Sequence, residues 1–230
     1  MIIDLEHHLS GAEQIIKGSS KSGRIVERYR DADGYIGLRI YEAAASVEKH
    51  LQFMDEAGID VAVLSRSPEM SVERSRQWND LCARIVKEHP KRFAGFASVP
   101  PLGGKPAFEE LERAVKELGL KGVHIFSRSG NHTLDNKEYW PFYEKVSELK
   151  TPIDVHIINR PQGFDALHAP YPFYYIMARE FDVCATTLRI CLGGVLEDFP
   201  DLIFIINHFG GGVSAVLERV DAYMGYVGPG

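Results

Sequence analysis

Four side chains in this sequence have the types and spacing of a metal-centred active site. Glu6 and His8 lie two residues apart near the start of the chain. Because side chains two apart on a β-strand project to the same side, this carboxylate and this imidazole can reach one cation. His156 lies in a short apolar run and can add a second nitrogen, and His208 follows another such run. Two nitrogens and one oxygen leave a coordination position for substrate or water, as a catalytic divalent metal requires.

The chemistry of these ligands also suggests which metal they hold. Zinc is the default for such a set, and a carboxylate ligand also suits Mn²⁺. A single Glu-x-His pair is weak support, because a histidine at a strand end is more often a hydrogen-bonded structural residue. Three candidate ligands at strand ends are harder to explain in that way. We therefore predict a divalent metal at Glu6, His8 and His156, with zinc first and manganese as the alternative.

Three arginines follow predicted strands, where they can hold an anionic substrate. They are Arg66, Arg128 and Arg160. A guanidinium suits a carboxylate because its donors match both oxygens. A surface ion pair is the alternative role for each of them. The expected partner is therefore a small carboxylic acid.

Other histidines have less specific surroundings. His7 alternates to the side of its strand opposite Glu6 and His8, so we expect it to pack against the surrounding helices. His50 falls on a predicted helix and is expected to be solvated. His124 lies within a predicted strand and can line the mouth of the site.

The elements that position these residues follow one repeating pattern, a short β-rich run followed by a loop and an amphipathic helix. Six such units in series predict a parallel sheet with right-handed crossovers, for which a closed barrel is the usual outcome. Catalytic groups then project from the carboxyl ends of the strands. The longest helix is expected to pass through Met177 and Val195 and to stop near Pro200. The predicted strands are Ile2–Leu5, Val61–Ser65, Phe93–Val99, Gly122–Phe126, Ile153–Ile158 and Ile203–Asn207.

The length of the chain fits one barrel, although the strand count falls short of eight. We predict an α/β fold, a TIM-type (β/α) barrel of the metal-dependent hydrolase type, over residues 1–230 as a single domain. It is expected to be C-terminally incomplete and to lack the last two βα units. Residues 10–38 are rich in glycine and charge and are predicted to be a loop or small insertion over the barrel mouth.

Composition excludes several classes of function. The net charge of −6, with no basic block, argues against a nucleic-acid partner. Apolar runs such as Leu202–Ile206 are too short to cross a membrane. The first residues lack the layout of a secretory signal, and the three cysteines are scattered and interpreted as reduced. We therefore expect a cytoplasmic protein.

Together these motifs resemble the amidohydrolase-related superfamily, in the branch of aminocarboxymuconate-semialdehyde decarboxylase and the benzoate-type decarboxylases. The resemblance covers nearly the whole chain. Its most specific part is the run Leu192-Gly-Gly-Val-Leu-Glu-Asp-Phe-Pro-Asp-Leu leading to Ile206-Asn-His-Phe-Gly-Gly-Gly. The segments Ile3-Asp-Leu-Glu-His-His and Pro152-Ile-Asp-Val-His add to it.

The resemblance implies a metal-dependent barrel in which Glu6, His8 and His156 are metal ligands and His208 orients or protonates near the metal. It also implies a possible homodimer. The family's usual first pair is His-x-His, and the Glu-x-His variant seen here occurs among aromatic-acid decarboxylases. The family's final aspartate ligand, from the eighth strand, has no counterpart that can be matched in this chain.

Three hypotheses follow. The first is non-oxidative removal of carbon dioxide from an aromatic or unsaturated carboxylic acid, with protonation by His208 or by water at the metal and with the acid held by an arginine such as Arg66. The second keeps the site but hydrolyses a lactone or amide, or hydrates a double bond, because fold and metal do not fix the chemistry. The third is a non-catalytic truncated barrel whose open sheet edges pair with another chain.

Overall fold

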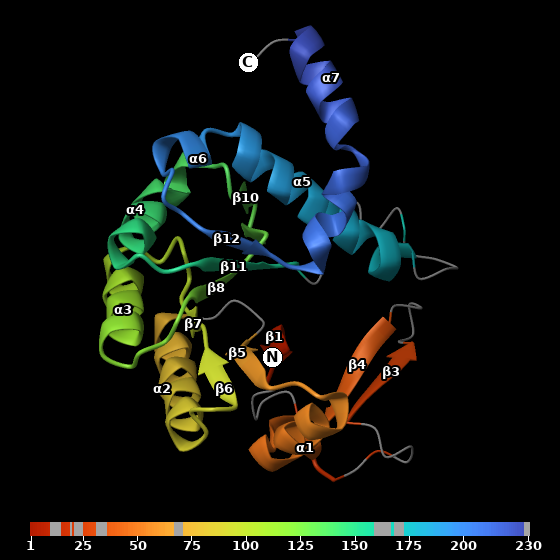
Figure 1. The fold of residues 1–230 in the computed structure, drawn as a ribbon, viewed down its shortest axis with the longest axis vertical. Coiled ribbons are helices and arrows are strands. Elements are labelled where there is room, and N and C mark those ends of the chain that lie inside the picture. Colours follow the sequence, from red (N-terminus) through yellow and green to blue (C-terminus); the bar gives the residue numbers. More distant parts are fainter. Residues whose placement is uncertain are drawn as a thin grey trace.

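The computed structural model describes residues 1–9, 15–18, 20, 25–30, 36–66, 71–158, 167 and 173–227 (Figure 1). Parallel strands form the wall that carries the site. They are β1 (Ile3–His8), β5 (Val61–Ser65), β6 (Phe93–Gly95), β7 (Ala97–Ser98), β8 (Val123–Phe126), β11 (Ile153–His156) and β12 (Phe204–Ile206). All six predicted strands are present, and the third is divided into β6 and β7.

The two halves of the third strand belong to two different sheets and connect them. β6 pairs with β5 in the order β1-β5-β6, and β7 pairs with β8 in the order β7-β8-β11-β12. Between them, the Phe96 N–H donates to the Leu64 carbonyl at 2.9 Å, while the Ala97 N–H donates to the Gly122 carbonyl at 2.8 Å. One bent strand thus pairs with a neighbour on each side, and the predicted parallel barrel wall is confirmed.

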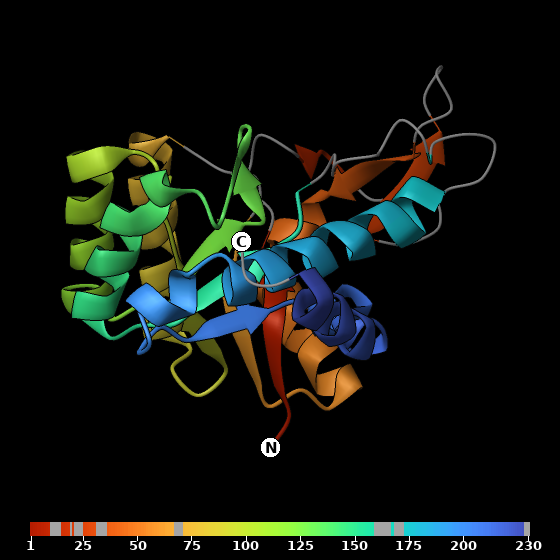
Figure 2. The same ribbon diagram turned by 90° about the horizontal axis from the view of Figure 1, so that it is seen from above.

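Helices follow most of these strands. They are α1 (Val47–Ala57), α2 (Val72–Glu88), α3 (Gly104–Lys116), α4 (Trp140–Leu149), α5 (Arg179–Leu192), α6 (Val195–Asp198) and α7 (Leu217–Val227). The last of them, α7, extends away from the strands (Figure 1). Figures 1 and 2 show α2, α3 and α4 together on one flank and β3 and β4 on the opposite side. No helix in the described ranges combines the length and apolar character needed to cross a bilayer.

The helix expected to be the longest is interrupted at both ends. A π-helical turn over Tyr174–Ala178 precedes α5, and Gly194, with φ of 80°, separates α5 from α6. With 14 residues, α5 is shorter than α2 with 17. The prediction of one continuous helix was wrong because the apolar spacing continues across the break, whereas the left-handed backbone of Gly194 ends the helix.

The core lies between the flank of helices and the strands. Its largest fully buried members include Trp78, Phe142 and Tyr143 from helices and Ile153 from β11. Burial of such side chains supplies about 1.5–3 kcal/mol each relative to exposure. Cys82 is buried in this core, but Cys191 is exposed, and all three cysteines are free thiols. The core therefore holds the helical flank firmly against the strands that end at the site.

The wall is open between β1 and β12. In the described part of the chain these two strands do not pair with each other. A cavity of about 660 Å³ lies between them, lined by residues 3–6 of β1, residues 205–209 and Glu180. The expected absence of the last two βα units stays a prediction.

The described part of residues 10–38 contains regular structure. Short strands β2 (Ile15–Ile16), β3 (Val26–Arg30) and β4 (Ile36–Tyr41) form a sheet in the order β2-β4-β3. The β3–β4 pair is antiparallel and the β2–β4 pair is parallel. Its placement over the barrel mouth stays a prediction.

Candidate metal centre

Strand β1 places Glu6 and His8 at the carboxyl edge of the sheet. His8 lies opposite Ser65 in the parallel ladder with β5, and the Ser65 Oγ lies 3.2 Å from His8 Nδ1. The register of this ladder shifts between Asp4 and His7, as at a β-bulge. The strand extends to His8, beyond the predicted end at Leu5, so both candidate ligands belong to the strand itself.

Strand β11 places His156 opposite Phe126 of β8, and its side chain is buried. His156 Nδ1 lies 2.7 Å from the Ile157 carbonyl oxygen. Since a carbonyl only accepts, Nδ1 carries the proton and the neutral ring presents the lone pair of Nε2. Burial lowers the pKa of His156, against the raising effect of Glu6, which favours this neutral form.

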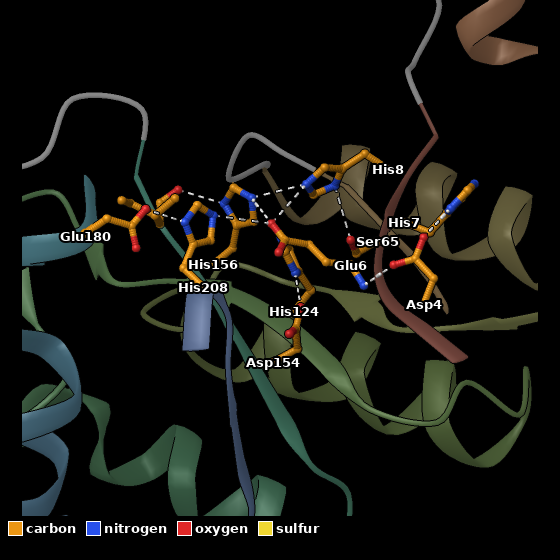
Figure 3. Close-up of polar contacts among 11 residues, drawn as sticks. Asp4, Glu6, His7, His8, Ser65, His124, Asp154, His156, Glu180 and His208 are labelled. Carbon is orange, nitrogen blue, oxygen red and sulfur yellow. Dashed lines mark hydrogen bonds and ion pairs between the residues drawn. The ribbon is translucent and has the colours of Figure 1, made fainter. Parts of the chain in front are cut away.

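The three candidate ligands converge, as Figure 3 shows. Glu6 Oε1 lies 3.0 Å from His156 Nε2 and 3.7 Å from His8 Nε2, and the two Nε2 atoms are 3.1 Å apart. Burial would raise the pKa of the Glu6 carboxyl, but the imidazole rings of His156 and His8 beside it outweigh this effect and hold the pKa well below its usual range. The carboxylate is therefore ionised at neutral pH.

This donor set fits a divalent cation. The 3.0 Å contact between Glu6 Oε1 and the neutral His156 Nε2 joins two acceptors, so no proton lies between them. A cation among Glu6, His8 and His156 would attract both lone pairs, and all their candidate ligand atoms lie within 4.8 Å of one another. Imidazole nitrogen with carboxylate oxygen is a ligand combination of catalytic metal sites.

His208 lies beside this cluster at the end of β12. Its Nε2 is 3.9 Å from Glu6 Oε1, and its Nδ1 is 2.7 Å from Glu180 Oε1 on α5. His208 and Phe209 have φ of 52° and 51°, in the left-handed region that residues other than glycine seldom adopt. Such strained backbone is concentrated at functional sites. Glu180 was not predicted, because it lies within a helix and no strand end marks it.

A further buried pair lies beneath the cluster. His124 Nδ1 is 2.5 Å from Asp154 Oδ2, and both residues are buried. The ring centroids of His124 and His156 are 5.3 Å apart. His124 therefore lies below the candidate ligands and supports the His156 ring, with its own ring facing the carboxylate of β11 (Figure 3).

The three predicted arginines differ in their positions. Arg66 directly follows β5 and is buried, with its guanidinium carbon 5.9 Å from the centroid of the Trp78 ring. Arg128 lies in the two-residue strand β9 (Arg128–Ser129) and lines a small cavity together with His124. Arg160 lies outside the described residues. Substrate binding by these arginines stays a prediction.

The histidines on the other side of β1 form a separate chain. His7 contacts Asp4 and His50, and His50 is buried against the Ala44 carbonyl. The expectation that His50 is solvated was wrong, because α1 turns this side chain toward β1 together with Met54, four residues later.

Comparison with known proteins agrees with this geometry. A family model described as amidohydrolase matches residues 3–228. The chain belongs to the amidohydrolase family. The resemblance inferred from the motifs is therefore confirmed.

The curated relatives of this member of the amidohydrolase family include several decarboxylases. Gamma-resorcylate decarboxylase of Rhodococcus jostii (strain RHA1) is 31% identical over 194 residues, which cover 74% of this chain and 58% of that protein. The 2-keto-4-carboxy-3-hexenedioate hydratase of Sphingobium sp. (strain NBRC 103272 / SYK-6) is 33% identical over 181 residues, covering 71% of this chain and 51% of that protein. The chain thus spans little more than half the length of these curated relatives.

A solved structure gives a similar result. The dihydroxybenzoic acid decarboxylase of Polaromonas sp. JS666, with bound manganese and the inhibitor 2-nitroresorcinol, is similar with a TM-score of 0.74 and 25% identity. The match covers 96% of this chain and 70% of that one. The structural similarity to this member of the family therefore extends over nearly all of the chain.

Proposed function

We propose that this chain carries the metal site of a non-oxidative decarboxylase acting on an aromatic or unsaturated carboxylic acid. The observation that carries the proposal is the cluster of Glu6, His8 and His156 with His208 beside it. Relatives named as gamma-resorcylate decarboxylase and 2-amino-3-carboxymuconate-6-semialdehyde decarboxylase support this reaction class.

Glu6, His8 and His156 would hold the metal. When bound, a divalent cation supplies positive charge that neutralises an anionic substrate and the charge that develops during carbon–carbon cleavage. Manganese is favoured over the predicted zinc because solved relatives are described with manganese and because the set includes a carboxylate. Metal analysis of the purified protein decides between the two.

His208 would supply the proton. Its position beside Glu6 allows the Nε2–H of the protonated ring to transfer a proton to the substrate carbon that bears the carboxylate. The bond to the carboxylate then breaks, carbon dioxide leaves, and the electron pair of that bond restores the unsaturated system. Arg66, next to Ser65 at the same edge of the sheet, is the candidate for holding the acid.

The test uses 2,6-dihydroxybenzoate, the ligand named for one solved relative. We expect the manganese-loaded protein to release labelled carbon dioxide from the ¹³C-carboxyl substrate, observed by NMR. His208→Asn should lower the rate by about 10²–10⁴-fold, the usual contribution of a general acid, and should keep the metal. Product without loss of the labelled carbon would overturn the proposal.

Hydration is the second candidate, because one relative is named as a hydratase. It predicts a product heavier by one water with all carbons retained. The third possibility, a barrel without catalytic function, predicts binding of metal without turnover of either kind. The homodimer, which the mass of the protein in solution tests, and the cytoplasmic location stay predictions.

A further inference from the structure

We infer that Glu180 is the positioning residue of His208, fixing which ring nitrogen faces the metal ligands. This inference rests on the proposed function, in which His208 acts at Nε2. Glu180 Oε1 lies 2.7 Å from His208 Nδ1, on the side of the ring away from Glu6. A carboxylate only accepts, so it selects the form in which Nδ1 carries a proton.

The contact with Glu180 sets the orientation of the His208 ring. With Nδ1 donating to Glu180, Nε2 is the atom that faces the cluster, 3.9 Å from Glu6 Oε1. A freely rotating imidazole would present either nitrogen, or carbon, to the substrate. Fixing the ring and its tautomer removes that choice before the reaction, which is the benefit of preorganised acid–base groups.

The helix that carries Glu180 is fixed against the His208 segment. The segment His208–Ala215, whose backbone has positive φ from His208 to Gly212, packs directly on α5 at Gly211, whose φ is 60°. A Cβ at this position would collide with the Glu180 carbonyl and lie 2.7 Å from Cys184 N. Glycine is therefore required for the close approach that brings Glu180 to His208.

A second attachment holds α5 from the side of the strands. Ser127, which directly follows β8, donates its hydroxyl to Asp182 Oδ2 at 2.5 Å. Since Asp182 lies two residues after Glu180, the first turn of α5 is fixed both to the end of β8 and to the glycine segment. The Glu180–His208 contact is thus built into the packing of three elements.

The test compares Glu180→Ala and Glu180→Gln with the control Glu144→Ala, an exposed glutamate on α4. In metal-free protein labelled with ¹⁵N-histidine, the His208 signals are assigned by their absence in His208→Gln. We expect the Nδ1–H tautomer in the wild type, in the control and in Glu180→Gln, which keeps an acceptor oxygen. Glu180→Ala should shift His208 toward Nε2–H. An unchanged tautomer in Glu180→Ala would overturn the inference.

Kinetics give the second readout. Glu180→Ala should lower kcat by about 100-fold and change KM by less than about twofold, since positioning acts on the proton transfer. The kcat of Glu180→Gln should be at least about tenfold higher than that of Glu180→Ala. Bound manganese should be equal in all variants. Equal losses in both variants, tracking a loss of thermal stability, would contradict positioning. A wild type without carbon dioxide release would overturn the proposed function alone, because the tautomer comparison still decides the role of Glu180.

Discussion

Two clusters of the same residue types meet at β1 but differ in their hydrogen bonding. One cluster brings Glu6 and His8 to His156. In the other cluster, His7 Nδ1 lies 2.8 Å from Asp4 Oδ2 and His7 Nε2 lies 2.8 Å from His50 Nδ1. Each set contains one carboxylate and two imidazoles from elements distant in the sequence. Neighbouring residues of one strand therefore belong to two clusters of equal composition.

The difference lies in whether each contact has a proton. His50 Nε2 must donate to the Ala44 carbonyl at 3.0 Å, so the neutral His50 ring accepts at Nδ1 from His7 Nε2–H. Burial lowers the pKa of His50, which favours this neutral form. One further proton between His7 and Asp4 completes the chain. At the Glu6–His156 contact, burial lowers the pKa of His156 and favours its neutral ring, so two lone pairs face each other and a bound cation would satisfy both.

The largest effects are expected when one histidine is removed from each cluster. In His156→Ala, bound metal should fall to the background level, because the two remaining ligands, Glu6 and His8, cannot replace the lost imidazole. Manganese added at 100 times its Kd should stabilise the wild type by about 2.7 kcal/mol and should leave His156→Ala unchanged. Elemental analysis after dialysis and thermal unfolding measure these effects. Wild-type metal content in His156→Ala would show that the ligand assignment is wrong.

The matched change on the other side is His50→Ala. We expect the free energy of unfolding to fall by about 2 kcal/mol, because His7 loses a buried partner and a cavity forms. Metal content should stay at the wild-type level. Chemical denaturation of the metal-free protein measures the stability, and loss of metal with His50→Ala would contradict the division into two independent clusters.

The smallest effect is expected for Ser65→Ala. Its hydroxyl contacts His8 Nδ1 at 3.2 Å, and such outer partners of a ligating histidine change metal affinity by about 10–100-fold. We place this variant near the lower value because the hydroxyl is a neutral partner. Competition with a metal-chelating dye measures the affinity. An affinity unchanged within error would mean that other contacts orient His8.

Strand-end reasoning identified much of the candidate site. Glu6, His8, His156 and His208 meet because the carboxyl ends of parallel strands share one edge of the sheet. Their roles stay proposals, but their proximity could be predicted from order and spacing alone. The barrel wall was predictable for the same reason, since each strand is a nearly continuous apolar run.

Residues whose role depends on helix packing could not be found in this way. Glu180 lies in a helix whose apolar spacing gives no sign of a neighbouring histidine. For His50 a signal existed, because it precedes Met54 by four residues and shares its face of α1. The break at Phe96 had no signal, because the apolar run Phe93–Val99 continues through it.

The division of the third strand at Phe96 affects the distance between β1 and β11. In a flat sheet with strands about 4.8 Å apart, β1 and β11, four intervals away from each other, would be separated by roughly 19 Å. Their histidine nitrogens are 3.1 Å apart. The wall must therefore curl round on itself, and at Phe96 the pairing passes from β5 on one side to β8 on the other. Straightening that corner would move the ligands apart from a distance, without altering any of them.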